Sequence, residues 1–434
     1  MPWTDRLAGR ARLPVLLQQR AFRRYWSAQT ISMFGDQVSA VAVPYTGILA
    51  LHADATEMGY LTAAIWLPSL LFALHAGSWA DRSRHRRRLM IGADLGRAAL
   101  LATVPVGAAL HVLTLAQLYA VAFAVGSLSV LFTVCDPAMF VALVPEPDYV
   151  RGQSLIYGSR AFSFVGGPSL GGVLVQALTA PLAVAADAVS YLGSAFSLSR
   201  IRPAEPPPDP ARRGTLTAGA RYIAGHGVVR ASLIAAVVIN FFNFMFVTLF
   251  ALYATRSLHI RPGELGVVLG AGAVGGVLGS LATRRITGRI GVGWGYVIGA
   301  VLFPAPLLLV PLAGGPHALI LAALFTSEFL SGAGVMVLDI SIGSIFAAVI
   351  PDRLRSRVTG AFQAVNYGSR PVGSLVAGAL GGAIGVRPTL WIAAAGGATA
   401  FVWLLPTPLP RFRMPETGKP PNVTEETRTI VSDS

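Results

Sequence analysis

"RPAEPPPDPARRG", residues 202–214, divides the chain into two parts of similar length. Its prolines lack the backbone N–H that a helix interior needs, and its charged residues favour contact with water. On each side of it lie six apolar stretches, each long enough to cross a bilayer. We therefore predict two halves joined by a hydrated linker at residues 200–230.

The apolar stretches set the fold class. A helix needs about 20 mostly apolar residues to cross the hydrocarbon core. Hydrophobic types make up 54% of the 434 residues and charged types 12%, about half of the charge in a soluble domain. We predict an all-α membrane protein with six spans within residues 25–199 and six within 231–406. The expected spans are residues 25–51, 58–80, 89–110, 114–143, 153–178, 180–199, 231–255, 264–283, 292–313, 317–349, 358–384 and 386–406.

The positions of the arginines predict the orientation. If the N-terminus is inside, the outer joints hold only Arg256, Arg261 and Arg387, and most other arginines fall inside. This bias is typical of the positive-inside rule and places residues 1–24 and 407–434 in the cytoplasm, with the spans in the cell (inner) membrane. The net charge of +14 is then a matter of topology, so anionic inner-leaflet lipids rather than nucleic acid are the expected partners.

One short motif occurs once in each half. Tyr-Gly-Ser-Arg stands at residues 157–160 and again at 367–370, and each copy is followed at the same distance by a glycine pair, 171–172 and 381–382. The copies fall early in the fifth and eleventh spans, which run in the same direction. A repeat of this kind predicts two pseudo-symmetric six-helix halves related by an axis along the membrane normal.

The joint between the second and third spans carries a longer motif. "GSWADRSRHRRRL", residues 77–89, resembles the loop signature G-x-L-a-D-r-x-G-r-k-x-x-l of major facilitator transporters. The matching residues are Gly77, Ala80, Asp81, Arg82, Arg86 and Leu89, and the departures are Trp79, Arg84 and His85. The resemblance implies the major facilitator fold and a contact of Asp81 with the eleventh span. The alternative is a basic anchor loop without this contact.

A second resemblance concerns the fifth span. "GGPSLGGVL", residues 166–174, resembles the antiporter signature of this superfamily at Gly167, Pro168, Gly171 and Gly172. Ordinary helix packing is the alternative, because glycine and proline are common in membrane helices. Three further stretches, 34–44, 91–98 and 185–198, resemble the drug:proton antiporter branch that contains macrolide efflux pumps and the enterobactin exporter. That resemblance implies proton-coupled export, although the fourth span lacks the embedded arginine of other drug antiporter branches.

Acids within the spans are candidates for proton coupling, because ionisable groups in a membrane are costly and mark transport pathways. Asp36, near the middle of the first span, is the leading candidate, and its alternative role is a hydrogen bond that packs helices. Asp187 and Glu328 are further candidates.

The two motif arginines are expected to pair with acids near an inner gate. Asp136 and Arg160 should lie at similar depth in neighbouring spans, and Asp339 and Arg370 are placed alike in the other half. A charge pair of this kind can hold one state of a gate and release in the other.

Two closely spaced pairs fall within single spans. Asp94 and Arg97 are three residues apart and should pair on one helix face. Asn240 and Asn243 have the same spacing and could face a polar cavity.

Other chemistry is not indicated. The sequence has no phosphate-binding glycine loop, no His-Glu-x-x-His and a single cysteine, so we expect no ATP drive, no metal and no cofactor. A membrane lipid or prenyl transferase, an alternative, would need clustered carboxylates, whereas these acids are scattered. We predict a monomeric secondary transporter, not an enzyme, that exports an amphipathic organic compound (a drug, antibiotic, siderophore or metabolite) for protons by alternating access. A passive or symporting importer of a small nutrient is the other alternative.

Overall fold

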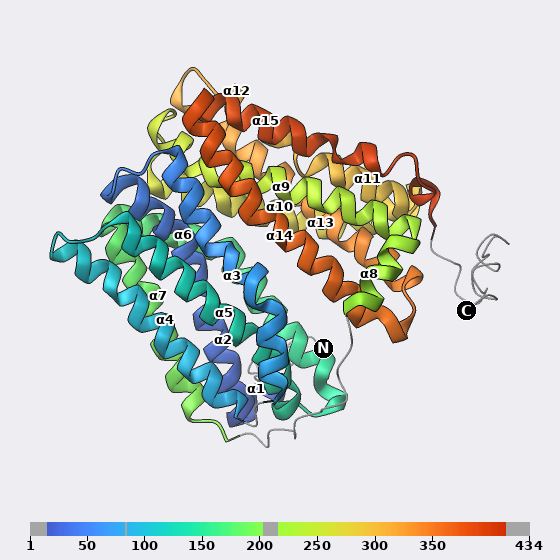
Figure 1. The fold of residues 1–434 in the computed structure, drawn as a ribbon, viewed down its shortest axis with the longest axis horizontal. Helices are drawn as coiled ribbons and strands as arrows, with labels where there is room; N and C mark the ends of the chain where they lie inside the picture. The colour runs from blue at the N-terminus through green and yellow to red at the C-terminus, as the bar shows by residue number, and fades with distance from the viewer. Residues whose placement is uncertain (1–14, 83–84, 203–215, 414–434) are drawn as a thin grey trace, which may run out of the picture.

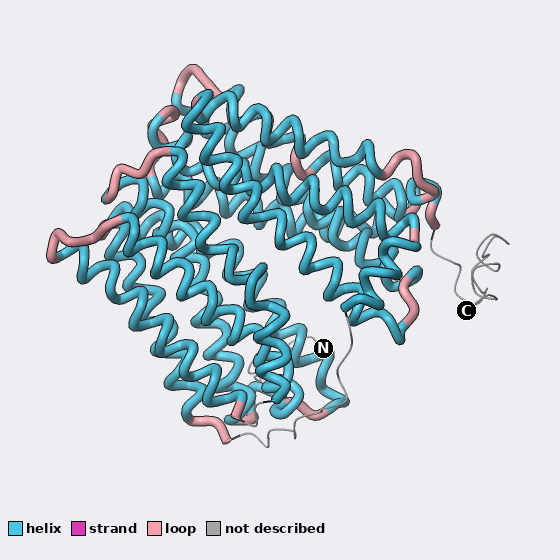
Figure 2. The backbone as a smooth tube through the Cα atoms, in the orientation of Figure 1, coloured by secondary structure: helices cyan, strands magenta, loops and turns pink. Residues whose placement is uncertain are grey.

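The computed structural model describes residues 15–82, 85–202 and 216–413, and every regular element among them is a helix (Figures 1 and 2). The helices form two bundles side by side, one from each half of the sequence. The predicted all-α fold of twelve spans in two six-helix halves is confirmed.

The N-terminal half begins with a short helix and contains six spans. Its elements are α1(Val15–Gln18), α2(Arg20–Tyr45) with its continuation η1(Thr46–Ala50), α3(Ala55–Arg82), α4(Arg86–Ala109), α5(Leu115–Leu143), the turn η2(Glu146–Asp148), α6(Tyr149–Ala177) and α7(Ala180–Ser199). Threonines start two of these spans: the hydroxyl of Thr114 accepts a bond from the amide of Gln117, and that of Thr179 from the amide of Leu182. Such N-caps satisfy amides that have no partner within the helix.

The C-terminal half repeats the pattern. Its elements are α9(Gly227–Arg256), α10(Pro262–Ile290), α11(Val292–Leu302) with η3(Ala305–Leu308) and α12(Leu309–Leu312), α13(His317–Val349), α14(Asp352–Ile384), α15(Val386–Ala398) with η4(Thr399–Trp403), and the final turn η5(Leu409–Arg411). The third span of this half is broken between α11 and α12, where Pro304 and Pro306 interrupt the helix.

The linker is more ordered than the sequence predicted. After its proline-rich part, which lies outside the described residues, α8(Leu216–Gly225) forms a ten-residue helix, and α9 begins at Gly227, before the expected boundary. Tyr222 of α8 donates a hydrogen bond of 2.8 Å to the carbonyl oxygen of Val349. A Cβ at Gly219 would lie 2.3 Å from the carbonyl oxygen of Arg357, so α8 packs closely on α14.

By length and composition, seven of the described helices are apolar enough to cross a membrane. They are α4, α5, α7, α9, α10, the broken span Val292–Leu312, and α13. The more polar α2, α6 and α14 are not among them, and these carry Asp36, Arg160 and Arg370. All three helices line a cavity between the halves, and α6 and α14 also pack on the opposite half, which accounts for their polar residues.

Glycines bring the two halves together along two seams. On the first, α3 meets α14, and a Cβ at Gly59 would lie 2.8 Å from the Cα of Gly378. On the second, α6 meets α10, and a Cβ at Gly172 would lie 3.0 Å from the Cα of Gly266. The fifth span packs on the eighth as the eleventh packs on the second, which is the pairing that a pseudo-two-fold axis requires.

Both seams lie at one end of the molecule. They involve the starts of α3 and α10 and the ends of α6 and α14, and a hydrogen bond of 3.1 Å from the amide of Gly263 to the Gln176 side chain reinforces one of them. Toward the other end, which carries α1 and α8, the bundles diverge (Figure 1). We call the first the contact end and the second the open end.

Candidate functional site

A cavity of about 730 Å³ lies between the diverging halves. Among the described residues, its lining comes from all six spans of the N-terminal half and, in the other half, from α14. Apolar side chains such as Met33, Ile65, Trp66 and Phe132 form much of the wall. The volume falls in the range of pockets that bury drug-sized molecules.

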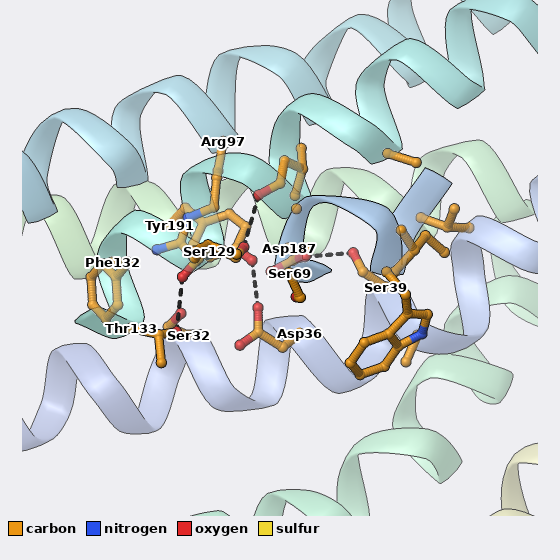
Figure 3. A pocket seen from close by; sticks show the side chains of 18 of the residues that line it. Ser32, Asp36, Ser39, Ser69, Arg97, Ser129, Phe132, Thr133, Asp187 and Tyr191 are labelled. Carbon is orange, nitrogen blue, oxygen red and sulfur yellow. Dashed lines mark hydrogen bonds between the residues drawn. The ribbon is translucent and has the colours of Figure 1, made fainter. Parts of the chain in front are cut away.

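Asp36 of α2 faces this cavity and is exposed in it. The phenol of Tyr191, on α7, donates a hydrogen bond to its Oδ1 (Figure 3). The neighbouring Gly35 allows the two helices to come this close, because a Cβ there would lie 2.0 Å from the Ser190 hydroxyl. The structure thus places the leading proton candidate at the cavity surface with a neutral partner.

Asp187 lies beside it on α7 and is only 1% exposed. It accepts a hydrogen bond from Ser39 of α2 (Figure 3) and another, at 2.9 Å, from Ser190. Both partners are hydroxyls, so the carboxyl group has neutral hydrogen-bond partners as Asp36 does.

Arg97 of α4 is the cation of this group. It forms the predicted ion pair with Asp94, which is confirmed, and it is 3% exposed. Its guanidinium carbon lies 4.0 Å from the ring centroid of Tyr191 and 4.7 Å from that of Phe132. These cation–π contacts hold the arginine against the tyrosine that binds Asp36.

The acid cluster, defined as Asp36, Asp94, Asp187, Arg97 and Tyr191, therefore has three carboxylates for one guanidinium. Asp94 takes the guanidinium, which leaves Asp36 and Asp187 with hydroxyl partners. A carboxyl group with a hydroxyl partner can be hydrogen-bonded both with and without its proton, because a hydroxyl donates and accepts. The arrangement can therefore bind and release a proton next to the cavity.

A second polar group lies nearer the open end, where Asp136 of α5 accepts a hydrogen bond of 2.6 Å from Tyr25 and another from Gln29, both on α2. The predicted ion pair of Asp136 with Arg160 is not among those of the described residues. Neutral donors occupy the carboxylate instead, and Arg160 is exposed in the cavity lining.

The other predicted ion pair, Arg370 with Asp339, is likewise absent from the described residues, and Asp339 is exposed on α13. Arg370 instead donates a hydrogen bond of 3.3 Å to the side-chain oxygen of Asn240, and aromatic rings surround its guanidinium. Both predicted ion pairs are therefore wrong for the described residues: Tyr25 and Gln29 bind Asp136, while Asn240 and the rings take up Arg370.

The remaining candidates lie apart from the cavity lining. Glu328 is half-buried where α13 meets α10, with a carboxylate oxygen 3.3 Å from where a Cβ of Gly272 would be. Asn240 binds Arg370, and neither it nor Asn243 lines the cavity. Of the three proton candidates, the structure brings Asp36 and Asp187 together and leaves Glu328 in the other half.

The structure describes less of the loop motif than of the antiporter motif. The surroundings of Gly77 and the side chains of Asp81 and Arg82 lie outside the described part of the structure, so the contact of this loop with α14 stays a prediction. Arg86 starts α4 and is 8% exposed.

In the antiporter motif, Cβ atoms at Gly167 and Gly171 would lie 2.4 Å from Gln37 and 3.1 Å from Val38 of α2. Gly172 faces α10, and the carbonyl oxygen of Pro168 approaches Gly266. The motif therefore packs α6 between α2 and the opposite half.

Sequence reasoning missed the tyrosines of both polar groups. Tyr191 stands four residues after Asp187, a spacing that places both on one face of α7, so this signal was present. Tyr25 and Gln29 have the same spacing on α2, but the boundary at residue 25 placed Tyr25 at the very edge of the span.

Two helical halves that meet at one end and diverge around a cavity define a multi-pass membrane transporter. The chain belongs to the family described as "Transmembrane secretion effector", whose model matches residues 14–426. It is a major facilitator transporter of the drug efflux kind and not an enzyme.

Two curated relatives are similar to this chain over most of their length. The "Multidrug efflux pump Tap" of Mycobacterium tuberculosis is 28% identical over 395 residues, which cover 83% of this chain and 87% of that protein. The "Uncharacterized MFS-type transporter YfiS" of Bacillus subtilis is 26% identical over 390 residues, covering 86% and 89%.

Solved structures share the fold at low identity. A bacterial homologue of the iron transporter ferroportin in an inward-facing state gives a TM-score of 0.69 at 14% identity, covering 89% of this chain and 98% of that one. A bacterial homologue of the lysosomal transporter Spinster, inward-facing and unoccupied, gives 0.69 at 13% identity, covering 90% and 96%.

Proposed function

We propose that this chain exports amphipathic organic compounds across the cell (inner) membrane in exchange for protons. The observation that carries the proposal is the acid cluster, in which Asp36 and Asp187 lie beside the cavity with hydroxyl partners. Protonatable groups next to the site where cargo binds are what an exchanger needs. The efflux pumps among the relatives support the direction of transport.

The orientation is part of the same proposal. The open end carries exposed arginines, among them Arg23, Arg221 and Arg285, and we place it in the cytoplasm by the positive-inside rule. Anionic lipid headgroups would contact this rim. The cavity then faces the cytoplasm, so cargo enters from inside and the halves must separate at the contact end to release it.

The cavity also suits the proposed cargo class. Its wall combines aromatic and aliphatic side chains with a few charged groups, and it is large enough for a drug-sized molecule. A small polar nutrient would leave most of this apolar surface unused, which favours an amphipathic cargo.

The test uses inside-out vesicles with an acidic interior and a pH-sensitive dye. If cargo enters in exchange for protons, adding it releases protons from the vesicles and the dye reports a partial loss of the gradient. A panel of amphipathic drugs is compared in vesicles with and without the protein. If no compound dissipates the gradient more in the first than in the second, proton-coupled export is overturned.

A further inference from the structure

We propose that Arg370 and the rings of Trp66, Phe244 and Tyr367 form a cation–π clamp that holds the two halves together beside the cavity and responds to its occupant. The clamp joins α14 and α9 of the C-terminal half to α3 of the N-terminal half. Its guanidinium carbon lies 4.0 Å from the ring centroid of Tyr367, 4.4 Å from Trp66 and 4.9 Å from Phe244.

Only Trp66 of these residues comes from the N-terminal half, so its contacts are the ones that bridge the halves. Its ring also meets Phe244 edge to face, with centroids 5.0 Å apart and planes at 77°. The Trp66 indole thus makes two attractive contacts, a cation–π contact with Arg370 and an edge-to-face contact with Phe244.

The place of the clamp along the seam gives it a gating role. The α3–α14 seam begins at the contact end, where Gly59 packs on Gly378, and continues toward the cavity. Trp66 lies about two helical turns farther along α3, and Arg370 lies about two turns back along α14. The clamp therefore lies beside the cavity, with the contact of Gly368 with Leu70 beyond it, and α3 and α14 cannot part at the contact end while it holds.

Aromatic rings rather than an acid serve as the partner of this cation. No ion pair among the described residues includes Arg370, and it donates a hydrogen bond to the neutral amide of Asn240. A buried ion pair within the half would be hard to break during a transport cycle. A guanidinium held by rings can be released and rehydrated at a smaller cost, which suits a contact that must form and break.

Two members of the clamp also touch the transport pathway. Trp66 and Tyr367 both line the cavity, whereas Arg370 lies next to their rings. A cargo molecule that moves either ring changes the contact with the guanidinium. The clamp thus links occupancy of the cavity to the seam that must open, and this link does not depend on protons.

The experiment measures how the halves are arranged, without cargo and without a proton gradient. Spin labels at Leu178 and Leu312, which are exposed near the contact end in opposite halves, report the separation there. In the full chain in lipid nanodiscs, we expect Arg370→Gln to raise the ratio of separated to closed molecules by about two- to thirty-fold, the range of a cation–π contact. Trp66→Ala should do the same, and Arg370→Lys and Trp66→Phe should restore much of the closed population.

Arg160→Gln is the matched control, because it neutralises the other copy of the motif and should leave the distances unchanged. The double variant Arg370→Gln/Trp66→Ala should shift the ratio no further than the larger single variant. Unchanged distances in Arg370→Gln, an equal shift in Arg160→Gln, or additive effects in the double variant would overturn the clamp. None of these outcomes depends on the proposed proton exchange.

A second measurement tests the link to the cavity. A fluorescent drug that binds the wild-type protein should change the Leu178–Leu312 distances, and this response should fall at least severalfold in Trp66→Phe/Tyr367→Leu if bound drug acts through the rings. A response of wild-type size in that variant would overturn the link.

Discussion

Arg160 and Arg370 end the two copies of Tyr-Gly-Ser-Arg, yet their surroundings differ. Arg370 is packed against three rings and hydrogen-bonded to Asn240. Arg160 is exposed in the cavity lining, and its ring contact is with Tyr157, 5.8 Å from the centroid. The same four residues in the same place of the fold therefore do not fix what an arginine contacts.

The helix opposite each copy explains the difference. Arg370 meets α3, which supplies Trp66. The seam that α6 forms with α10 includes Gly270, where a Cβ would lie 3.1 Å from the carbonyl oxygen of Val165, and residues 271–276 of α10 are only Gly, Ala and Val. Small residues let the backbones approach but offer no ring to a guanidinium.

The acids of the two halves are also arranged differently. Asp36, Asp94 and Asp187 gather around Arg97 in the N-terminal half, whereas Glu328 and Asp339 of the C-terminal half lie apart. The glycine seams preserve the symmetry that rocking needs. The polar chemistry is divided, with proton binding proposed in one half and the clamp anchored in the other.

The largest expected effect tests this division of the acids. Asp36→Asn should reduce gradient-driven cargo accumulation by about tenfold or more, since a carboxamide, unlike a carboxyl group, does not gain or lose a proton at physiological pH. Exchange of cargo down its own gradient should continue, because the cavity keeps its shape. Transport in vesicles measures both. Glu328→Gln, the matched change in the other half, should stay within about twofold of wild type, and strong uncoupling by this variant would contradict the division.

The sequence predicted the spans well because length and hydrophobicity decide them. The ends of the helices were less predictable: α14 begins at Asp352 and α9 at Gly227, because a helix satisfies its own backbone beyond the apolar part of a span. The proline-free sequence after the linker's proline run allowed α8 to form.

Side-chain partners were the hardest to predict. The Asp94–Arg97 pair followed from spacing within one helix, and the structure shows it. The pairs of Asp136 with Arg160 and Asp339 with Arg370 required the rotation of two helices, which a single sequence does not contain. Tyr25, on the first span, also donates a hydrogen bond to Asp136. The spacing of the acids and arginines in the sequence does not predict this neutral donor from another helix.

The next effect tests whether the two glycine seams are equivalent. Gly172→Ala would place a methyl group 2.4 Å from the carbonyl oxygen of Pro262, and Gly59→Ala would place one 2.8 Å from the Cα of Gly378. Both contacts are with backbone, and such overpacking costs about 1–3 kcal/mol. Either variant should separate the contact end, as spin labels at Leu178 and Leu312 would report.

Gly343→Ala is the control for both seams, because nothing lies within 4 Å of its Cβ position. A shift in only one of the two seam variants would show that the seams, although alike in their contacts, differ in how much they stabilise the closed contact end.

A smaller effect separates the two arginines by stability. Arg370→Gln removes a half-buried group that three rings hold and should lower the melting temperature, at a cost of about 1 kcal/mol. Arg160→Gln removes an exposed group and should change stability by less than about 0.5 kcal/mol. Thermal unfolding in nanodiscs, followed by tryptophan fluorescence, compares them. Equal melting temperatures for the two variants would mean that the rings contribute nothing.

The smallest effect concerns Gly158 and Gly368, the glycines of the two Tyr-Gly-Ser-Arg motifs. Nothing lies within 4 Å of a Cβ at Gly158, whereas a Cβ at Gly368 would lie 3.1 Å from Leu70. Within a helix, alanine is favoured over glycine by about 0.5–1 kcal/mol. Gly158→Ala should therefore raise the melting temperature slightly. Gly368→Ala should gain less, because the end of the Leu70 side chain must move aside, and a larger gain in Gly368→Ala than in Gly158→Ala would show that the two copies do not differ in packing as the structure has them.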